Sequence, residues 1–199
     1  MTSEQEDRLT VDVERLRRGG IPVQAERRLL ELGEAGAGHL AFTSDLSPDE
    51  AGLLRRHGYQ PLGLVTGSAV YHVGQAYASI QGDVEVSVLS SAYDEATRLA
   101  VSRLEQEARA VKAEGVVGVR YSMLRQEWTQ GLIEVQVIGT AVRGPQAGGQ
   151  APWLSDLSGQ EWWALYRAGY EPAGLVWGHC VWFILTDFSD LAILQGWTN

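Results

Sequence analysis

The chain has 199 residues, 45% of them hydrophobic, which is enough to build the core of one large or two small globular domains. A formal net charge of -9 argues against a general phosphate-binding surface, because nucleic-acid affinity rests largely on Lys and Arg. No secretory signal and no apolar run of membrane-spanning length is found, and the single cysteine excludes an internal disulfide. We therefore expect a cytoplasmic protein with no nucleic-acid or membrane partner.

Two helices are the first predicted elements. Ser3 and Glu6 have the spacing of a capping box, and the helix that they begin should end at Gly19-Gly20. Pro22 suits the first turn of a second helix, because its missing N–H is harmless there. Residues 33–38 have the small and polar composition of a linker. Residues 1–41 should thus form an N-terminal helical segment.

A stretch of sequence then occurs twice. Phe42-Thr-Ser-Asp-Leu-Ser-Pro-Asp-Glu and His57-Gly-Tyr-Gln-Pro-Leu-Gly-Leu-Val-Thr-Gly-Ser return as Trp153-Leu-Ser-Asp-Leu-Ser-Gly-Gln-Glu and Ala168-Gly-Tyr-Glu-Pro-Ala-Gly-Leu-Val-Trp-Gly-His. Such self-similarity indicates a duplicated unit. In each copy a serine should cap a short helix, a glycine should end it, and a strand-like run should follow, over 62–73 and 173–185.

Only the first copy continues into further elements. Residues 74–82 have the composition of a loop, and 83–89 suit a short strand or an extended approach to a helix. Ser90 or Ser91 should cap a long amphipathic helix from Ala92 to Glu114, which Gly115 would end. The β-rich segments 116–124 and 132–142 predict an antiparallel hairpin. Glycines inside both strands, at 118 and 139, indicate a bend, a bulge or close backbone contact.

Two motifs in this region carry a family resemblance. The run Ala113-Glu-Gly-Val-Val-Gly-Val-Arg120 and the strand end Ile138-Gly-Thr-Ala-Val142 resemble the YbjQ-like family, often labelled "putative heavy-metal-binding". The resemblance covers about 62–143, and 153–185 resembles the opening of a second such domain. It implies an α+β fold, a small β-α-β-β domain of the dodecin-like type with a long helix on an antiparallel sheet. It also implies rings, commonly pentamers, joined through sheet edges, and an uncovered strand edge favours the same outcome physically.

The expected organisation follows from these elements. Residues 1–41 form the N-terminal helical segment, 42–144 the first YbjQ-like domain with its helical preface, 145–152 a linker, and 153–199 a partial second repeat. The second copy lacks the long helix and the hairpin, so it is either a degenerate half domain or part of a truncated one. In the first case, Trp177 to Leu185 should add to the first domain's sheet or to a neighbour's.

No pattern predicts a catalytic, cofactor-binding or metal-ligating residue. The four histidines and Cys180 have no metal-ligand spacing, and His179 and Cys180 would point to opposite faces of a strand. Cys180 lies in an apolar run, where we expect it to be buried and inert. Arg120 follows a valine-rich run, and an ion pair with Glu134 or Glu107 is favoured over anion binding.

Two functions are left open. The first is a non-enzymatic, ring-forming assembly or binding module, a homo-oligomer with the pentamer favoured, whose N-terminal helices offer a surface to a protein partner. The second is a metal- or small-ligand-binding protein. Its site would gather His72 or His179 around a ring axis, or stack a flat ligand on the tryptophans of the second copy, Trp153, Trp162, Trp163, Trp177 and Trp182. No cofactor can be named, and no enzyme is expected.

Overall fold

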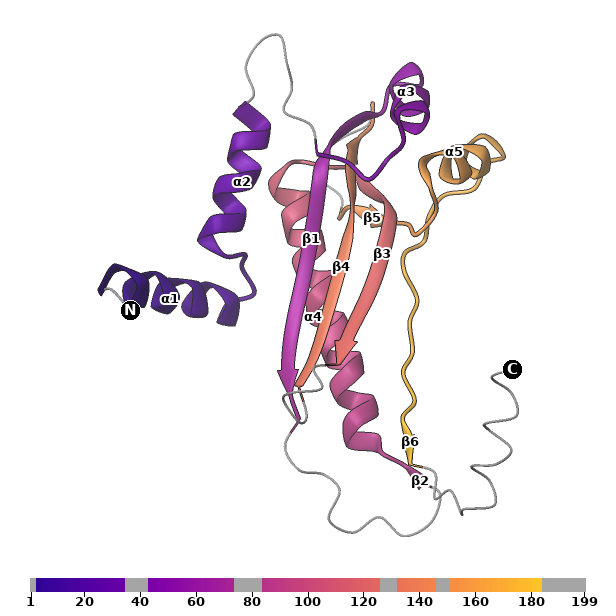
Figure 1. Cartoon of the computed structure of the whole chain (residues 1–199). Coiled ribbons are helices and arrows are strands. Elements are labelled where there is room, and N and C mark those ends of the chain that lie inside the picture. Colours follow the sequence, from indigo (N-terminus) through magenta and orange to yellow (C-terminus); the bar gives the residue numbers. More distant parts are fainter. Residues whose placement is uncertain (1–2, 35–42, 74–83, 126–131, 146–150, 184–199) are drawn as a thin grey trace, which may run out of the picture.

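The computed structural model describes residues 3–34, 43–73, 84–125, 132–145 and 151–183 (Figure 1). Two N-terminal helices come first, followed by the elements of the first copy and then by those of the second. In chain order these are α1 Ser3–Arg17, α2 Val23–Glu34, α3 Pro48–Arg56, β1 Gln60–His72, β2 Val84–Glu85, α4 Ser87–Ala110, β3 Gly115–Arg125, β4 Leu132–Arg143, β5 Trp153–Leu154, α5 Gly159–Arg167 and β6 Trp182–Phe183.

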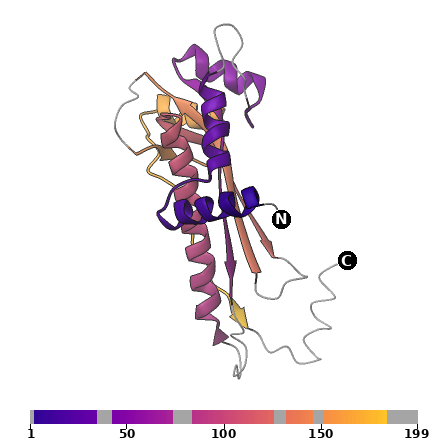
Figure 2. The same ribbon diagram turned by 90° about the vertical axis from the view of Figure 1, so that its left-hand side faces the viewer.

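One four-stranded sheet organises the molecule, with the strand order β1-β4-β3-β5. β1, β4 and β3 are antiparallel, whereas the short β5 joins the outer side of β3 in parallel. The helix α4 covers one face of this sheet, and α1 and α2 lie on the side of β1 (Figures 1 and 2). The structure is the α+β fold expected from the sequence.

The main core lies between α4 and the sheet. Val65 and Ala69 of β1 pack with alanines of α4 and with valines of β3 and β4. At Gly67 the helix crosses so closely that an added Cβ would lie 1.9 Å from the carbonyl oxygen of Ala100. Small residues on both elements therefore allow the helix to lie against the strand.

The limits of α4 differ from the prediction. The helix begins at Ser87, before the predicted Ala92, with Val86 as an N-cap that makes no side-chain hydrogen bond. Ser90 lies buried inside the helix and accepts a hydrogen bond from the N–H of Val181, so it is not a cap. The helix ends at Ala110, because Lys112 adopts a left-handed φ of 56° and turns the chain before Gly115.

The hairpin and its irregularity agree with the prediction. β3 and β4 pair in antiparallel fashion, and their register shifts between Val117 and Arg120. Gly118 lies inside this bulge with a φ of 62°. In β4, a Cβ at Gly139 would lie 2.6 Å from Val116, which is the close contact that a glycine inside a strand indicates.

The segment after α5 differs most from expectation. Residues 173–185 were expected to form a strand, but within the described part only β6 pairs, and it pairs with β2 rather than with the main sheet. From 171 to 181 the chain is extended without a ladder and runs beside β3 toward β2 (Figure 1). Residues 177–183 therefore do not add to the main sheet of the first domain, so this alternative is wrong for them; residues 184–185 lie outside the described residues, and addition to a neighbour's sheet stays a prediction. No helix of the described segments is both long and apolar enough to cross a bilayer.

Candidate functional site

The second copy is joined to the first at the outer edge of β3. Main-chain hydrogen bonds of 2.8 to 3.1 Å connect the segment 153–157 with residues 114–119. They run from Trp153 N to Glu114 O, from Ser155 N to Val116 O, from Gly118 N to Leu157 O and from Val119 N to Ser155 O. Because Gly118 forms the bulge, two successive N–H groups of β3 reach the second copy. The bulge therefore turns the N–H groups of Gly118 and Val119 to the outer side of β3, where both donate to the second copy.

An aromatic cluster, defined by Tyr59, Trp153, Trp162 and Tyr166, fills this joint. Trp162 is 2% exposed and stacks on Trp153 at a centroid distance of 5.1 Å and on Tyr166 at 5.2 Å. Tyr59 of the first copy meets the Trp162 ring edge-on at 4.7 Å. Burial and the hydrogen bond with Tyr166 raise the pKa of the Tyr59 phenol, which keeps it neutral. The tryptophans at 153 and 162 therefore serve packing between the copies.

Two glycines beside the cluster leave space for its rings, because they have no side chain. A Cβ at Gly115 would lie 2.1 Å from the ring of Trp153, and one at Gly144 would lie 2.5 Å from the ring of Tyr59. Outside the cluster, Trp163 stacks on His57 with a centroid distance of 3.9 Å. Two rings of the first copy, Tyr59 and His57, thus contact rings of the second copy across the joint.

The capping helices of the two copies also meet. Both predicted capping boxes are present, with Ser47 and Glu50 on α3 and Ser158 and Glu161 on α5. The second carboxylate oxygen of Glu50 accepts a hydrogen bond of 3.1 Å from the N–H of Gly159, in the first turn of α5. Burial alone would raise the pKa of the Glu50 carboxyl, but the hydrogen bonds from Ser47 and Gly159 outweigh it and lower that pKa. One carboxylate therefore caps two helices.

The equivalent segment of the first copy, its preface at residues 43–46 just before α3, has no such strand partner among the described residues. Ser44 and Ser155 form the same local turn, each accepting from the N–H two residues later, at 2.9 and 3.2 Å. Ser44 then contacts only a side chain of the sheet, the hydroxyl of Thr140 at 3.3 Å. Among the described residues, 43–46 make no main-chain ladder. The same sequence is thus paired with a strand edge through its main chain in the second copy, whereas in the first copy it contacts the sheet through side chains.

Arg120 forms an ion pair, as predicted, but its partner is Asp45 of this preface. Glu107, one of the two predicted partners, is bonded to Arg28 of α2 instead. Glu134, the other one, lies on the neighbouring strand. The expected partners lie on α4 and β4, whereas the partner in the structure, Asp45, precedes α3.

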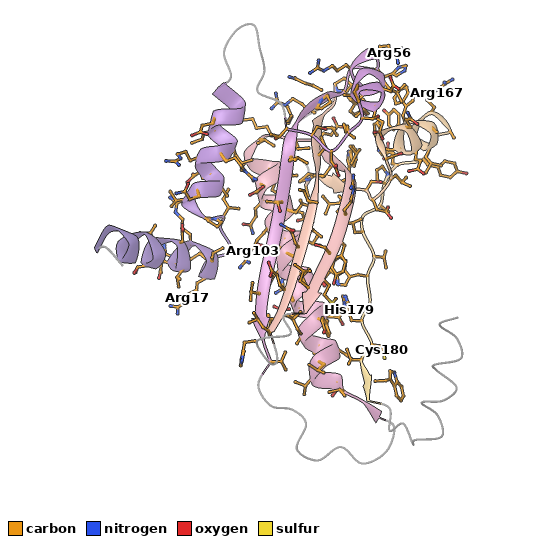
Figure 3. All side chains as sticks on the ribbon, in the orientation of Figure 1. Arg17, Arg56, Arg103, Arg167, His179 and Cys180 are labelled. Atoms are coloured by element: carbon orange, nitrogen blue, oxygen red, sulfur yellow. The ribbon has the colours of Figure 1, made fainter. Side chains whose placement is uncertain are left out.

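The opposite edge of the sheet, along β1, is closed by side chains. The N–H of Leu64 donates to Thr43 at 3.3 Å and that of Thr66 donates to Glu107 at 2.8 Å. The carbonyl oxygen of Ser68 accepts from Arg103 of α4. Alternate residues of a strand direct their main-chain groups to the same side, so these three would otherwise offer an edge to another strand. Figure 3 labels Arg103 beside β1.

Glu107 connects this edge to the N-terminal helices. Its side chain is 4% exposed and bonds both the N–H of Thr66 and the guanidinium of Arg28. Burial raises the pKa of the Glu107 carboxyl, although Thr66 and Arg28 partly oppose that shift. Arg28 is thus the residue through which α2 contacts the edge of β1.

The extended segment 171–181 is held to the first copy at one side. The Nδ1 of His179 lies 2.8 Å from Asp94, and its Nε2 lies 3.2 Å from the hydroxyl of Tyr121. The ring also stacks on Tyr93 at a centroid distance of 5.8 Å. Leu175 packs against the main core. His179 therefore anchors the segment to α4 and β3 (Figure 3).

The metal ligands considered from the sequence do not come together. Within the described segments, no three His, Cys, Asp or Glu side chains are grouped to hold a metal ion. His72 lies exposed at the end of β1, while His179 is engaged with Asp94 and Tyr121. Cys180 is exposed, so the prediction of burial is wrong: among the described residues its Sγ accepts a hydrogen bond of 2.9 Å from the indole N–H of Trp182, and it is not part of the core. The donor set of the described residues does not fit a heavy-metal site in one chain.

Comparison with known proteins supports the family resemblance. Residues 56–144 match the YbjQ family model, whose description is "putative heavy-metal-binding". A UPF0145 protein of Helicobacter hepaticus is 34% identical over 90 residues, which are 43% of this chain and 85% of that protein. The chain belongs to the YbjQ-like family. The resemblance predicted from the two sequence motifs is therefore confirmed for the first copy.

A second relative extends beyond this family region. An encapsulin nanocompartment protein of Mycobacterium tuberculosis is 40% identical over 151 residues, which are 72% of this chain. The chain covers 57% of the length of that relative. The similarity to it is thus broader along this chain than the match to the family model.

Proposed function

We propose that this YbjQ-like chain is a non-enzymatic assembly module that forms homo-oligomeric rings, with five members favoured, in the cytoplasm. The observation that carries the proposal is the joint inside the chain. There, the preface of one copy, residues 153–157, extends the sheet of the other at residues 114–119. The two surfaces are different, and contacts between different surfaces form closed rings when the rotation between units closes.

The two sheet edges have unequal roles in this proposal. The β1 edge is occupied by Thr43, Glu107 and Arg103. Among the described residues no strand pairs with β3 from Tyr121 to Arg125, although the extended segment 171–181 lies beside it (Figure 1) and His179 bonds Tyr121. Assembly is therefore proposed to use the β3 side. The relative whose name refers to a nanocompartment gives separate support for a role in an assembly.

The N-terminal helices are proposed as a surface for a protein partner. Four large apolar residues of these helices are 41% to 58% exposed, namely Val11, Val13, Val23 and Leu30. Apolar residues that a chain leaves on its surface can serve as contacts for a partner. The proposal is separate from ring formation, because α1 and α2 lie on the β1 side of the sheet (Figure 2).

Light scattering coupled to size-exclusion chromatography, with native mass spectrometry, tests the ring. We expect one discrete oligomer that persists on dilution through the micromolar range. A chain that is a monomer throughout this range would refute the proposal.

Paired lysine substitutions test the edge. Ser122 of β3 and Gln136 of the central strand β4 are exposed neighbours in register. Ser122→Lys should shift the chain toward the monomer, because a lysine on an edge strand opposes strand addition. Gln136→Lys should leave the oligomer unchanged. If both variants dissociate the oligomer, or neither does, the contact is not made at the β3 edge.

A further inference from the structure

A cavity of about 1100 Å³ lies beside the joint, between the C-terminal half of α4, the aromatic cluster and the start of the extended segment 171–181. Its lining includes Glu114 after the helix, Trp162 of the cluster and Trp177 of the segment. Pockets that bind small molecules commonly enclose about 300–1,000 Å³. The cavity is therefore large enough for a small organic ligand.

Two residues of this lining carry a buried polar atom that has no hydrogen-bond partner among the described residues. These atoms are the indole Nε1 of Trp162, a side chain that is 2% exposed, and the carboxylate Oε2 of Glu114. An indole N–H can only donate a hydrogen bond, and an ionised carboxylate can only accept one. Because most buried polar groups are hydrogen-bonded, the pair fits a molecule that offers one acceptor and one donor.

Tyr59 shows that the two groups lie near each other. The ring of Trp162 meets the ring of Tyr59 edge-on, at a centroid distance of 4.7 Å. A Cβ added at Gly144 would lie 2.2 Å from the Oε2 of Glu114 and 2.5 Å from the ring of Tyr59, so the carboxylate lies against the same ring. One small ligand can therefore reach both groups.

Trp177 adds a surface on which a flat ligand can stack. Its side chain lines the cavity and is 41% exposed, and among the described residues its ring stacks on no other. The rings of Trp153, Trp162 and Tyr166, in contrast, already stack on one another. Stacking on an indole favours a flat, aromatic partner.

The charges of the lining indicate the charge of the ligand. Three cations and three carboxylates line the cavity, namely Arg109, Lys112, Arg143, Glu105, Glu114 and Glu171. Arg109 is bonded to Glu105 at 3.0 Å, and the guanidinium of Arg143 donates to the carbonyl oxygen of Val111 at 2.7 Å. Because the charges balance and two of the cations are engaged within the chain, the lining favours an uncharged ligand over a phosphate or an organic cation.

We propose that this cavity binds an uncharged, flat heterocycle with a ring N–H and a C=O side by side, as in the bases uracil and hypoxanthine. The N–H would donate to Glu114, the C=O would accept from the indole of Trp162, and the heterocycle would stack on Trp177. In a trans amide the N–H and the C=O point to opposite sides, whereas a cyclic amide holds both on one edge, as two neighbouring partners require. The site lies within one chain, so the proposal does not depend on oligomerisation.

Binding of uridine and of inosine to the full chain tests the proposal. Each nucleoside is compared with its analogue methylated at the ring nitrogen next to the C=O, which keeps the flat base and loses the N–H. Titration calorimetry measures Kd, and tryptophan fluorescence reports the stacking. We expect at least one of the two nucleosides to bind, and its methylated analogue to bind more weakly by about tenfold or more, because a site that hydrogen-bonds its ligand rejects a molecule that lacks the bond.

Three variants of the full chain test the assigned residues. Trp177→Ala should weaken binding by about tenfold, since stacking on the indole is lost. Trp182→Ala, at an exposed tryptophan that does not line the cavity, is the matched control and should bind as the unchanged chain does. Trp162→Phe keeps an aromatic ring but loses the N–H, and it should also weaken binding by about tenfold, with circular dichroism as the check that it is folded.

The outcomes that contradict the proposal are distinct. If neither nucleoside binds at millimolar concentration, water or other groups of the chain satisfy Trp162 and Glu114, and the proposal is overturned. Equal affinities for a nucleoside and its methylated analogue would overturn it as well, because Glu114 would then not accept the ring N–H. Unchanged binding by Trp177→Ala or by folded Trp162→Phe would have the same result.

Discussion

Replacing Gly67 by alanine should destabilise the fold, whereas the same change at its repeat counterpart Gly178 should not. The added Cβ at Gly67 would lie 1.9 Å from Ala100 O and 2.6 Å from Leu104 N. Ordinary contact begins at 3.4 Å, so α4 must move by 1.5 Å, the difference between 3.4 and 1.9 Å. Both obstructing atoms belong to the main chain and cannot rotate away. Overpacking costs about 1–3 kcal/mol, and we expect the upper part of that range.

Thermal unfolding followed by circular dichroism provides the measurement. Gly67→Ala should lower Tm by roughly 5–10 °C, because about 1 kcal/mol shifts Tm by about 2–4 °C in a chain of this size. Gly178→Ala should shift Tm by less than about 2 °C, since surface substitutions are usually within about 0.5 kcal/mol. Neither glycine has a positive φ, so the pair isolates the contact with α4. Equal Tm values for the two variants would refute the reasoning.

Three further changes address the joint and the β1 edge. Arg28→Ala should cost about 1–3 kcal/mol in urea unfolding, and more at pH 8 than at pH 5. Burial raises the pKa of the Glu107 carboxyl, so the stability that its protonated form contributes is complete below the ordinary value of 4.5 and is lost as pH rises. The ionised carboxylate at pH 8 therefore relies more on Arg28. The same cost of Arg28→Ala at pH 5 and at pH 8 would contradict this. Ser158→Ala should remove the α5 cap and cost about 1 kcal/mol, with Ser122→Ala as the unaffected control. Trp162→Ala should cost about 3–5 kcal/mol and make the second copy sensitive to limited proteolysis. An equal cost of Trp163→Ala would contradict the view that Trp162 is the buried centre of the aromatic cluster.

Local features were the ones that the sequence predicted well. The serine caps at 47 and 158 and the left-handed glycines at 58 and 169 depend on residues within a few positions of one another. The same holds for the bulge at Gly118, because a glycine inside a strand commonly marks a bulge, a bend or a close backbone approach. Caps and glycine turns therefore need only local sequence, and the bulge needs only the pairing of two strands that follow each other in the chain.

Features that depend on distant contacts were missed. Asp45 pairs with Arg120 across the fold, and no spacing in the sequence indicates it. Cys180 is exposed because, among the described residues, no helix covers this side of the segment, which an apolar run cannot reveal. For the joint, a signal was present: aromatic residues in the second copy and glycine at 115 are complementary in size, but only the structure brings Trp153 to that glycine.

The closure of the β1 edge has a consequence for synthesis. Arg28 and Thr43 precede β1 in the chain, so they are translated before the strand that they protect, whereas Arg103 and Glu107 follow it. A nascent chain that ends shortly after His72 therefore has only Thr43 ready to bond the edge. Until α4 has been made, the main-chain groups of Thr66 and Ser68 lack their partners, and neighbouring chains on one messenger could pair through them. The edge of β1 is therefore closed only after α4 has been translated, and its other edge only after β4 has been translated.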